Sequence, residues 1–533
     1  MLFFWLFTLL TAALAAEYAY IVVEGGTSGL IVANRLSEDP STSVLVIEAG
    51  SSVYDNINVT DIDRLAYTYD SPIDWAYKSI PQEYGGHFQV LHASQALGGT
   101  SVMNELIVRS GLRTNRVRTN GYMGELGNDG WTWDNLFPYY LKSENMSAPN
   151  QTQAEAGASI EPTYNNREGL LHVGFLNIKK QENNLTTALN RTLDSMGVPS
   201  NPDLNTGHMR GFTIHPSTVD VSMVSEVMLL ARTTGPWKHH RTGDDITAAG
   251  VEIKTQNGEE QLIRAKKEVI LAAGALRSPA ILELSGVGNL KILKQHGIPV
   301  RTDLPSVGEN LQDQLNTSIV VSTNTPVTGT RTVAFASASD IFGSSLASVA
   351  ASIFSQLPHY ASATAAMSNG AMKASDLQKL FEIQHDQIFN KKVSIVEFVF
   401  ILEGAQSIHT GYWNLLPFAR GNSHITSANP EAAPVVNPNY GMLEWDTQIQ
   451  VAMSKFLRRI YRTDTPNHHV IGTASMLPRS MGGVVDNRLK VYGTTNVRVV
   501  DATIQPMQLS GHPMANLYAI AEWVSDMIKE TEN

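Results

Sequence analysis

The N-terminal part of the chain alternates apolar runs with a glycine-rich turn. Residues 20–23 form an apolar run of strand length that leads into the turn at 24–29, which has the sequence EGGTSG. The stretch 30–36 has apolar residues at helical spacing, and 43–47 is a second apolar run, followed directly by Glu48. This order predicts a strand, a turn, a helix and a parallel strand, which is the βαβ unit of a dinucleotide-binding domain.

The turn at 24–29 indicates phosphate binding, because its glycines let the backbone approach a pyrophosphate that rests on the N-terminus of the next helix. Glu48 follows at the distance typical of an acidic residue that accepts hydrogen bonds from a ribose. Glu24, however, replaces the first glycine of the motif. A carboxylate about 4 Å from a phosphate costs on the order of 4 kcal/mol at an effective dielectric constant of ~20. We therefore expect Glu24 to point away, or Gly25 to make the turn in its place.

Further strands are predicted far along the chain. The apolar runs 268–274 and 497–501 are typical of buried strands, so a nucleotide-binding sheet would draw on both ends and the middle of the sequence. Runs at 410–418 and 423–425 are interpreted as strands of a second domain, and the Ala/Ser-rich stretch 334–371 as helix and loop. With 533 residues the chain is too long for one compact core.

The predicted organisation is therefore two interleaved domains. The nucleotide-binding domain would comprise 17–165, 245–315 and 468–533. The second domain, expected to bind the substrate, would comprise 166–244 and 316–467.

Composition excludes several classes of protein. The 39 basic and 50 acidic residues give a net charge of −11, which makes nucleic acid an unsuitable partner because phosphate binding needs clustered Lys and Arg. The chain contains no cysteine, so disulfides, cysteine nucleophiles and thiolate metal sites are excluded. We predict no metal site.

The N-terminus predicts entry into the secretory pathway. Residues 1–16 are apolar and end in small residues (ALAA), as in a signal peptide. This stretch is shorter than the ~20 residues of a spanning helix, so we expect cleavage and no stable membrane span. A secreted glycoprotein also agrees with six Asn-X-Ser/Thr triplets, at Asn58, Asn145, Asn150, Asn184, Asn190 and Asn316.

Two further motifs carry glycines. Residues 93–104 (ASQALGGTSVMN) place hydroxyl groups beside paired glycines, which suits close backbone approach to a flat ring or a phosphate, although a plain surface turn has the same pattern. Residues 274–288 (GALRSPAILELSGVG) predict a helix that begins at Ser278 and Pro279.

These two motifs resemble the signature sequences of the glucose–methanol–choline (GMC) family of FAD-dependent oxidoreductases. Residues 304–314 and the C-terminal block from His469 to Met514 share the resemblance, which spans about 20–529. Within the family, the chain is most similar to the fungal glucose oxidase and patulin synthase branch, notably at 412–425. The resemblance implies an α/β fold with a Rossmann-like FAD-binding domain and an inserted substrate-binding domain built on an antiparallel sheet and helices.

The resemblance also implies the site residues. His469 matches the catalytic base of the family, since that base stands three residues before a glycine, here Gly472, and His512 matches the second active-site residue. His468 is only the neighbour of the base. The positions that bind FAD in the family correspond to Gly26, Thr27, Ser28, Gly29, Glu48, Ala49, Asn104, Glu105, Leu106, Ile107, Asp501, Ala502, Pro513 and Met514.

The implied reaction is oxidation of an alcohol group on a small molecule or secondary metabolite. A base takes the hydroxyl proton while hydride leaves for the flavin, and imidazole suits this task because it titrates near working pH. The electron acceptor would be oxygen or a quinone. The substrate, the acceptor and the linkage of FAD are left open by the sequence.

Four departures from the family pattern keep two alternatives open. Glu24 replaces a glycine, and Ser94 stands where the family usually has a basic residue. The stretch 219–250 is shortened, and the chain passes at 461–467 almost directly from a helix to the catalytic block, where relatives have a longer segment. One alternative is a non-redox cyclase on the same fold, similar to versicolorin B synthase. The other is a catalytically inactive secreted member of the family.

Overall fold

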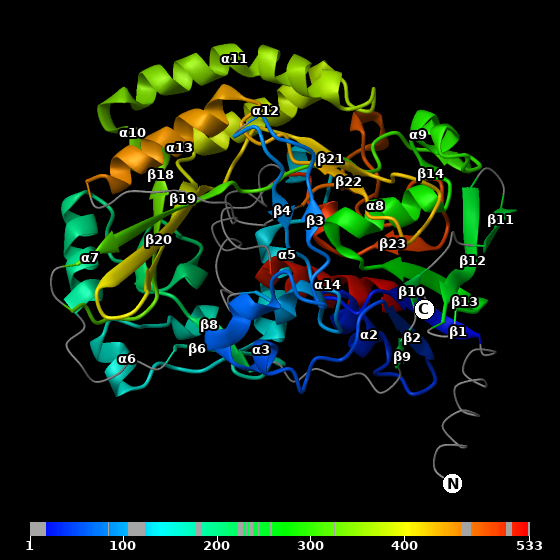
Figure 1. Ribbon diagram of the computed structural model, residues 1–533, viewed down its shortest axis with the longest axis horizontal. Coiled ribbons are helices and arrows are strands. Elements are labelled where there is room, and N and C mark those ends of the chain that lie inside the picture. Colours follow the sequence, from blue (N-terminus) through cyan, green and yellow to red (C-terminus); the bar gives the residue numbers. More distant parts are fainter. Residues whose placement is uncertain are drawn as a thin grey trace, which may run out of the picture.

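The computed structural model describes residues 17–83, 85–104, 123–176, 184–220, 228–230, 232–233, 238–242, 245–255, 258–323, 326–459, 471–507 and 514–530. The molecule is elongated, and its two largest sheets lie towards opposite ends of the long axis (Figure 1).

The first sheet unites strands from distant parts of the sequence. Strand β1 (Tyr18–Val23) lies parallel to β2 (Val44–Glu48) on one side and to β13 (Glu260–Leu271) on the other. Strand β23 (Val497–Val499) pairs in parallel with β13. β1 and β2 are buried at every residue, which explains why they read as continuous apolar runs rather than as alternating ones. The predicted βαβ unit and shared sheet are confirmed, while the exact domain boundaries stay a prediction.

The remaining strands of this sheet come mainly from residues 219–250, the stretch that is shortened relative to the family pattern. β9 pairs in parallel with β2, β10 and β11 pair antiparallel with β12, and β12 pairs antiparallel with β13. Their bounds are β9 (Met228–Leu230), β10 (Arg232–Thr233), β11 (Lys238–Thr242) and β12 (Asp245–Lys254).

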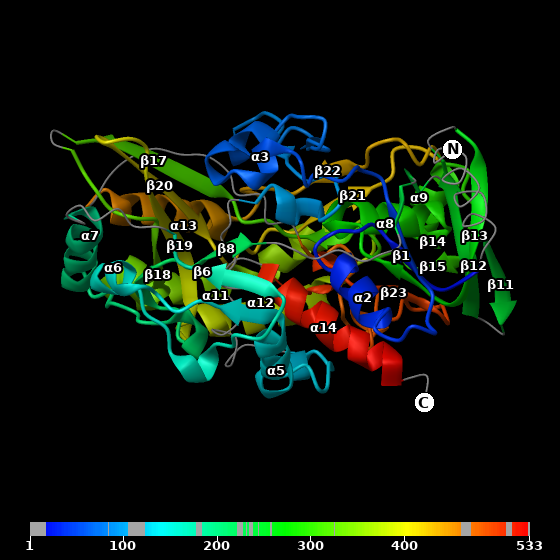
Figure 2. The same ribbon diagram turned by 90° about the horizontal axis from the view of Figure 1, so that it is seen from below.

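Helices pack against this sheet from both ends of the chain. Helix α2 (Gly29–Leu36) follows the glycine turn and lies beside α14 (Met514–Glu530), which in turn packs against α5 (Trp133–Ser143) (Figure 2). Arg35 of α2 donates two hydrogen bonds to Glu522 of α14, at 2.5 and 2.8 Å. This paired contact fixes the C-terminal helix to the first βαβ unit.

The second large sheet has five antiparallel strands, in the order β17-β20-β19-β18-β7. Helix α13 (Glu444–Leu457) covers one of its faces, where the ring of Phe456 stacks on Phe398 of β19, and the Tyr412 and Ser454 hydroxyls lie 2.7 Å apart. The antiparallel second sheet with covering helices confirms the predicted fold class. The strands are β7 (Gly211–Ile214), β17 (Asn316–Ser322), β18 (Thr332–Ser337), β19 (Ser394–Leu402) and β20 (Ser407–Asn414).

Smaller sheets and helices complete the fold. The sheets are β3 (Tyr77–Lys78) with β4 (Val90–Leu91), β14 (Val287–Gly288) with β15 (Thr302–Asp303), β5 (Glu144–Met146) with β6 (Leu171–Gly174) and β8 (Ser217–Asp220), and β16 (Glu309–Leu311) with β21 (Gly421–His424) and β22 (Val435–Asn437). The helices are α3 (Ile57–Thr60), α6 (Gln151–Glu155), α7 (Asn184–Ser195), α9 (Leu290–Gln295) and α12 (Ala374–Phe389).

The helix predicted to begin at Ser278 and Pro279 begins earlier. Helix α8 (Gly274–Leu284) contains Pro279 in its interior, where proline has no N–H to bond the carbonyl four residues before it. That carbonyl, of Ala275, instead accepts a hydrogen bond from the Thr473 hydroxyl. The predicted start was wrong because a contact from a distant part of the chain satisfies the group that the proline leaves unpaired.

The stretch 334–371 is not only helix and loop, because its first residues belong to β18. The run Ala338–Met367 then comprises α10 (Ala338–Phe342), a 3-10 turn and α11 (Leu346–Met367), and by length and composition alone it could cross a membrane. Such a run is weak evidence, and one side of α11 is buried against the protein through Ile353, Leu357 and Tyr360. The absence of a stable span stays a prediction.

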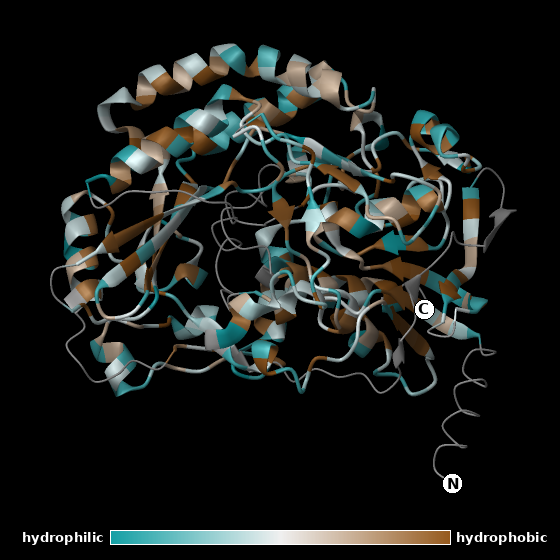
Figure 3. Ribbon diagram, viewed as in Figure 1, coloured by the Kyte–Doolittle hydropathy of each residue, from teal (hydrophilic) through white to brown (hydrophobic). Residues whose placement is uncertain are grey.

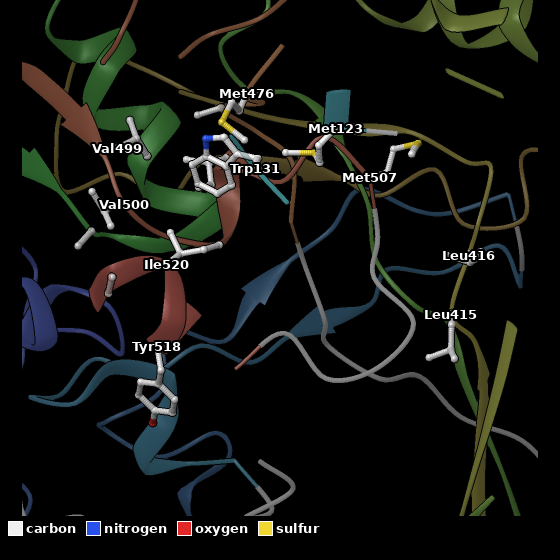
Figure 4. Close-up of a cluster of buried hydrophobic side chains, with 14 of the residues drawn as sticks. Met123, Trp131, Leu415, Leu416, Met476, Val499, Val500, Met507, Tyr518 and Ile520 are labelled. Atoms are coloured by element: carbon white, nitrogen blue, oxygen red, sulfur yellow. The ribbon is translucent and has the colours of Figure 1, made fainter. Parts of the chain in front are cut away.

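The hydrophobic core is continuous from the first sheet to the second. In Figure 3 the strands in the interior are mostly brown, whereas the outward sides of several helices are teal. Figure 4 shows part of this core, to which β23 contributes Val499, α14 contributes Ile520, and the loop before α5 contributes Trp131. The indole N–H of Trp131 donates to the Asn487 carbonyl at 3.0 Å. This shared core holds the C-terminal segments in place beside the nucleotide-binding sheet.

Candidate cofactor site

A cavity opens at the carboxyl ends of β1 and β13, between the glycine turn and the start of α8. The volume of the cavity, including the space at its open mouth, is about 1250 Å³. This edge is where open parallel sheets bind their ligands. Of the residues predicted from the sequence, it is lined by Gly26, Thr27, Ser28, Glu48, Asn104, Asp501 and Ala502.

The glycine turn packs too closely for side chains. A Cβ atom on Gly29 would lie 2.3 Å from the carbonyl oxygen of Glu24, so the turn requires glycine at that position. The Ser28 hydroxyl donates a hydrogen bond of 2.5 Å to the Val500 carbonyl, which fixes the start of α2 to the chain after β23. The N-terminus of α2 is thereby held at the cavity wall, where its backbone dipole favours an anionic group.

The second glycine motif lies directly on the first. Gly99 has a φ of 55°, and a Cβ atom on it would lie 2.7 Å from the Cα of Gly26. The Asn104 amide donates to the Ser101 carbonyl at 3.2 Å, and both residues line the cavity. The two motifs therefore pack against each other through their backbones and together form one wall of the cavity.

Two glutamates meet at the end of β2. The carboxylate of Glu48 accepts the backbone N–H groups of Gly50 at 2.7 Å and Gly25 at 2.9 Å. Glu24 adopts the left-handed conformation itself, with a φ of 73°, and its Oε2 atom accepts the Ala49 N–H at 3.2 Å. Glu24 lines the cavity, with its carboxyl group turned to the end of β2.

Asp501 connects the start of α8 to the chain after β23. One carboxylate oxygen accepts the Gly274 N–H at 3.0 Å and the Ser278 hydroxyl at 2.5 Å, while the other accepts the Thr503 N–H at 2.9 Å and its hydroxyl at 2.5 Å. Burial raises the pKa of Asp501, and these hydrogen bonds act in the opposite direction. Gly274 and Asp501 both line the cavity, so this carboxylate shapes its wall.

If this cavity holds the FAD that the sequence implies, we expect Asp501→Asn to lose part of it and to unfold more easily. The new amide N–H₂ would face the Gly274 N–H, and a buried donor left without an acceptor costs about 1–3 kcal/mol. The thermal midpoint and the ratio of flavin to protein measure the two effects. Asp39→Asn is the matched control, because exposed Asp39 accepts similar bonds from Ser41 and should change neither value.

The wall of the cavity suits a ligand with polar groups. Tyr77 and Ser94 line it, and their hydroxyl groups are buried with no hydrogen-bond partner among the described residues. The guanidinium of Arg277 lies 4.6 Å from the centre of the Trp75 ring and donates to the Ala432 carbonyl at 3.2 Å. Buried polar groups are normally paired, so these atoms fit the hydroxyl and phosphate oxygens of FAD.

Four residues that line the cavity were not predicted as site residues from the sequence: Trp75, Tyr77, Ser94 and Arg277. Ser94 and Arg277 stand inside the two motifs that carry the family resemblance, so their position was a usable signal. Trp75 and Tyr77 are two residues apart, and Tyr77 begins β3. Residues two apart on a strand face the same side, so this spacing is the pattern of a strand with one face on a pocket.

Several predicted residues cannot be placed. His469, His512, Glu105, Leu106, Ile107 and Pro513 lie outside the described residues, and of Met514 only its place at the start of α14 is described. Gly29 lies at the end of the glycine turn, and Ala49 directly follows β2. Both are next to residues that line the cavity but do not line it themselves.

Comparison with known proteins identifies the family. Two models named GMC oxidoreductase match the chain, at residues 18–316 and 417–521. The chain belongs to the GMC oxidoreductase family. It is 37% identical to a glucose oxidase-like protein of Humicola fuscoatra, over 96% of this chain and 95% of that protein. It is 31% identical to a glucose oxidase of Aspergillus carbonarius, over 96% and 92%. The predicted family and branch are confirmed.

Solved structures of GMC oxidoreductases share the fold. An FAD-dependent oxidoreductase from Chaetomium thermophilum matches with a TM-score of 0.84 and 26% identity, over 97% of this chain and all of that one. A fungal aryl-alcohol oxidase matches with a TM-score of 0.80 and 23% identity, a likeness in fold alone. The chain is an FAD-dependent oxidoreductase that acts on CH–OH donors, as the sequence predicted.

Proposed function

We propose that this GMC oxidoreductase oxidises an alcohol group of a small molecule or secondary metabolite, with His469 as the base and His512 as the second active-site residue. The matches to fungal glucose oxidases support a small-molecule substrate and favour oxygen over a quinone as the acceptor. Imidazole suits both histidines, since one must take the hydroxyl proton and the other must hold or return a proton near neutral pH.

We propose that FAD lies along the whole length of the cavity. Gly26, Thr27 and Ser28 would bind the pyrophosphate at the start of α2, and Glu48 would accept hydrogen bonds from the ribose. Asn104 and the chain from Asp501 would lie along the flavin, with the other family positions predicted from the sequence. When bound, FAD supplies the acceptor for the hydride.

One observation carries the assignment of the cavity to FAD. Both glycine motifs, the end of β2 and the Asp501 anchor enclose the same space, although Asp501 lies hundreds of residues after the other three in the sequence. An absorbance spectrum of the purified protein tests it, and should show flavin bands that bleach when the true alcohol substrate is added without oxygen. Protein that is folded but takes up no FAD would contradict the proposal.

The same experiment separates the two alternatives. A product that is isomeric with its substrate, formed without bleaching, would support a cyclase. Bound FAD that no alcohol in a broad panel reduces would support an inactive member of the family.

We also propose that the protein is secreted and glycosylated. Its apolar first 16 residues and its six Asn-X-Ser/Thr triplets support this. Mass spectrometry of protein from the culture medium tests it, since the expected mature chain begins after Ala16 and carries glycans. Full-length protein that stays in the cells would contradict it.

A further inference from the structure

Asn310 stands where strand β16 departs from regular pairing. Glu309 and Leu311 pair with consecutive residues of β21, so Asn310 between them is an extra residue, a β-bulge. Its φ of 65° lies in the left-handed region, which residues with a Cβ seldom adopt. A bulge redirects a side chain out of the regular ladder, and the Asn310 amide is buried in the protein interior.

Two side-chain amides meet at one carbonyl group. The Asn310 amide donates to the Pro506 carbonyl at 3.1 Å, and the Gln312 amide donates to the same oxygen at 3.2 Å. A carbonyl can only accept, so both side chains must turn their nitrogen atoms towards it. Pro506 is thereby held from two sides, and His512 follows it by six residues in the sequence.

The same two residues also hold the chain that follows His469. Gln312 and Ile471 exchange two backbone hydrogen bonds, at 2.9 and 3.0 Å. The Asn310 amide donates to the Ser475 hydroxyl at 2.8 Å. Because His469 stands two residues before Ile471 in the sequence, these contacts lie close to it along the chain.

Gly472 brings the two backbones into direct contact. A Cβ atom on it would lie 2.3 Å from the Asn310 carbonyl oxygen, and its φ of 97° is one that favours glycine. Its own carbonyl accepts the Ser475 hydroxyl at 2.5 Å. The glycine three residues after the proposed base is therefore required, because the chain passes directly against the bulge there.

Asn310 carries two costs that stability alone does not explain. Its left-handed backbone is strained, and its Oδ1 atom is buried with no hydrogen-bond partner in the part of the chain that the structure describes. Local strain concentrates at functional sites, where the surroundings hold it in place. These costs indicate a positional role for the bonds that its amide donates.

We propose that Asn310 and Gln312 are positioning residues, which fix the chain after His469 and the chain before His512 relative to each other. The inference rests on the proposed roles of these two histidines. The stretches 472–476 and 502–504 also run side by side, joined by backbone hydrogen bonds of 2.8, 3.0 and 3.4 Å. A base must meet the reacting hydroxyl group closely, and a misplacement of about 1 Å can slow a reaction about a hundredfold.

Two substitutions remove the amides with little change to the backbone. Asn310→Gly suits the left-handed conformation, so it should leave the protein folded. Gln312→Met keeps the length of the side chain but donates nothing to the shared carbonyl. Asn201→Gly is the matched control, because the buried Asn201 amide also donates to two carbonyls, those of His208 and Arg210, outside the proposed site.

The rate of flavin reduction is measured by anaerobic stopped-flow with the fastest alcohol of a panel that includes benzyl alcohol. We expect Asn310→Gly and Gln312→Met to lower the limiting rate about ten- to a hundredfold, with little change in bound FAD or in the alcohol concentration for half-maximal rate. In a His469→Ala background, Asn310→Gly should cost no more than a few fold, because no base remains to be positioned. Asn201→Gly should keep the natural rate within a few fold.

Amide hydrogen exchange gives a second readout, which needs no substrate. Peptides that contain residues 471–476 and 502–507 should exchange faster in both variants than in the natural protein. Peptides from β1 and β2 should exchange at the natural rate, since neither amide contacts these strands.

Three results would overturn the inference. They are natural reduction rates in both variants, an equal loss from Asn310→Gly in the natural and His469→Ala backgrounds, and unchanged exchange in the two segments. If no alcohol of the panel reduces the natural protein, or if His469→Ala is reduced as fast as the natural protein, the proposed function itself fails.

Discussion

Replacing His469 with alanine is expected to lower the rate of flavin reduction by substrate about 10²- to 10⁴-fold, the usual contribution of a general base. The alcohol must lose its hydroxyl proton as the hydride leaves, and without the imidazole only water can take that proton. The measurement is anaerobic stopped-flow of the flavin absorbance. Bound FAD should be unchanged, because the proposed role of this residue is proton transfer and not cofactor binding.

The neighbouring histidine provides the matched control. His468→Ala removes an imidazole one residue away in the sequence, and it should leave the reduction rate within a few fold of the natural value. His512→Ala should resemble His469→Ala if the two histidines act together. Equal rates for the His469→Ala and natural proteins would contradict the assigned base.

The second large effect is on stability and concerns a buried cluster away from the cavity. His424 of β21 lies between two glutamates, with its Nδ1 atom 2.7 Å from Glu283 and its Nε2 atom 3.0 Å from Glu309. The two carboxylates are also bonded to the Ile425 N–H and the Asn369 amide. Burial by itself lowers the pKa of His424, but the hydrogen bonds to both glutamates outweigh it and raise the pKa to about 10.

We expect His424→Ala to lower the free energy of unfolding by about 3–5 kcal/mol, because removing one partner leaves buried carboxylates without their counter-charge. His409→Ala is the matched control. His409 has the same 2.7 Å separation from Glu403, but His409 is only half-buried and Glu403 is exposed, so its loss should cost about 0–1 kcal/mol. Urea unfolding at pH 6 compares the two variants. Similar losses for both would contradict the assignment of a charged buried cluster.

The contribution of His424 should depend on pH. Its pKa is higher in the folded protein than the usual value near 6.5, so the stabilisation is complete below about pH 6.5 and is lost as pH rises towards 10. The difference in unfolding free energy between the natural and His424→Ala proteins should therefore shrink between pH 6 and pH 10. A constant difference over this range would show that His424 is neutral when folded.

Much of the nucleotide-binding sheet was predictable because burial leaves a local pattern. The apolar runs that became β1 and β2, and the turn between them, were read directly from residue spacing. The helix α8 was predicted with a wrong start, because the Thr473 hydroxyl that accommodates Pro279 comes from a distant part of the sequence. The strand at the beginning of 334–371 was missed because small residues carry little strand signal.

The sequence by itself determined the family, the cofactor and the identities of the proposed site residues, since motifs such as the glycine turn are short and local. The tertiary structure decided how those residues are paired. It placed the Glu24 carboxyl at the Ala49 N–H, bound Asp501 to the start of α8, and left Tyr77 and Ser94 lining the cavity. It also brought His424 to Glu283 and Glu309, which lie 141 and 115 residues away. Hydrogen bonds depend on distance and direction in space, and sequence spacing gives neither for groups so far apart along the chain.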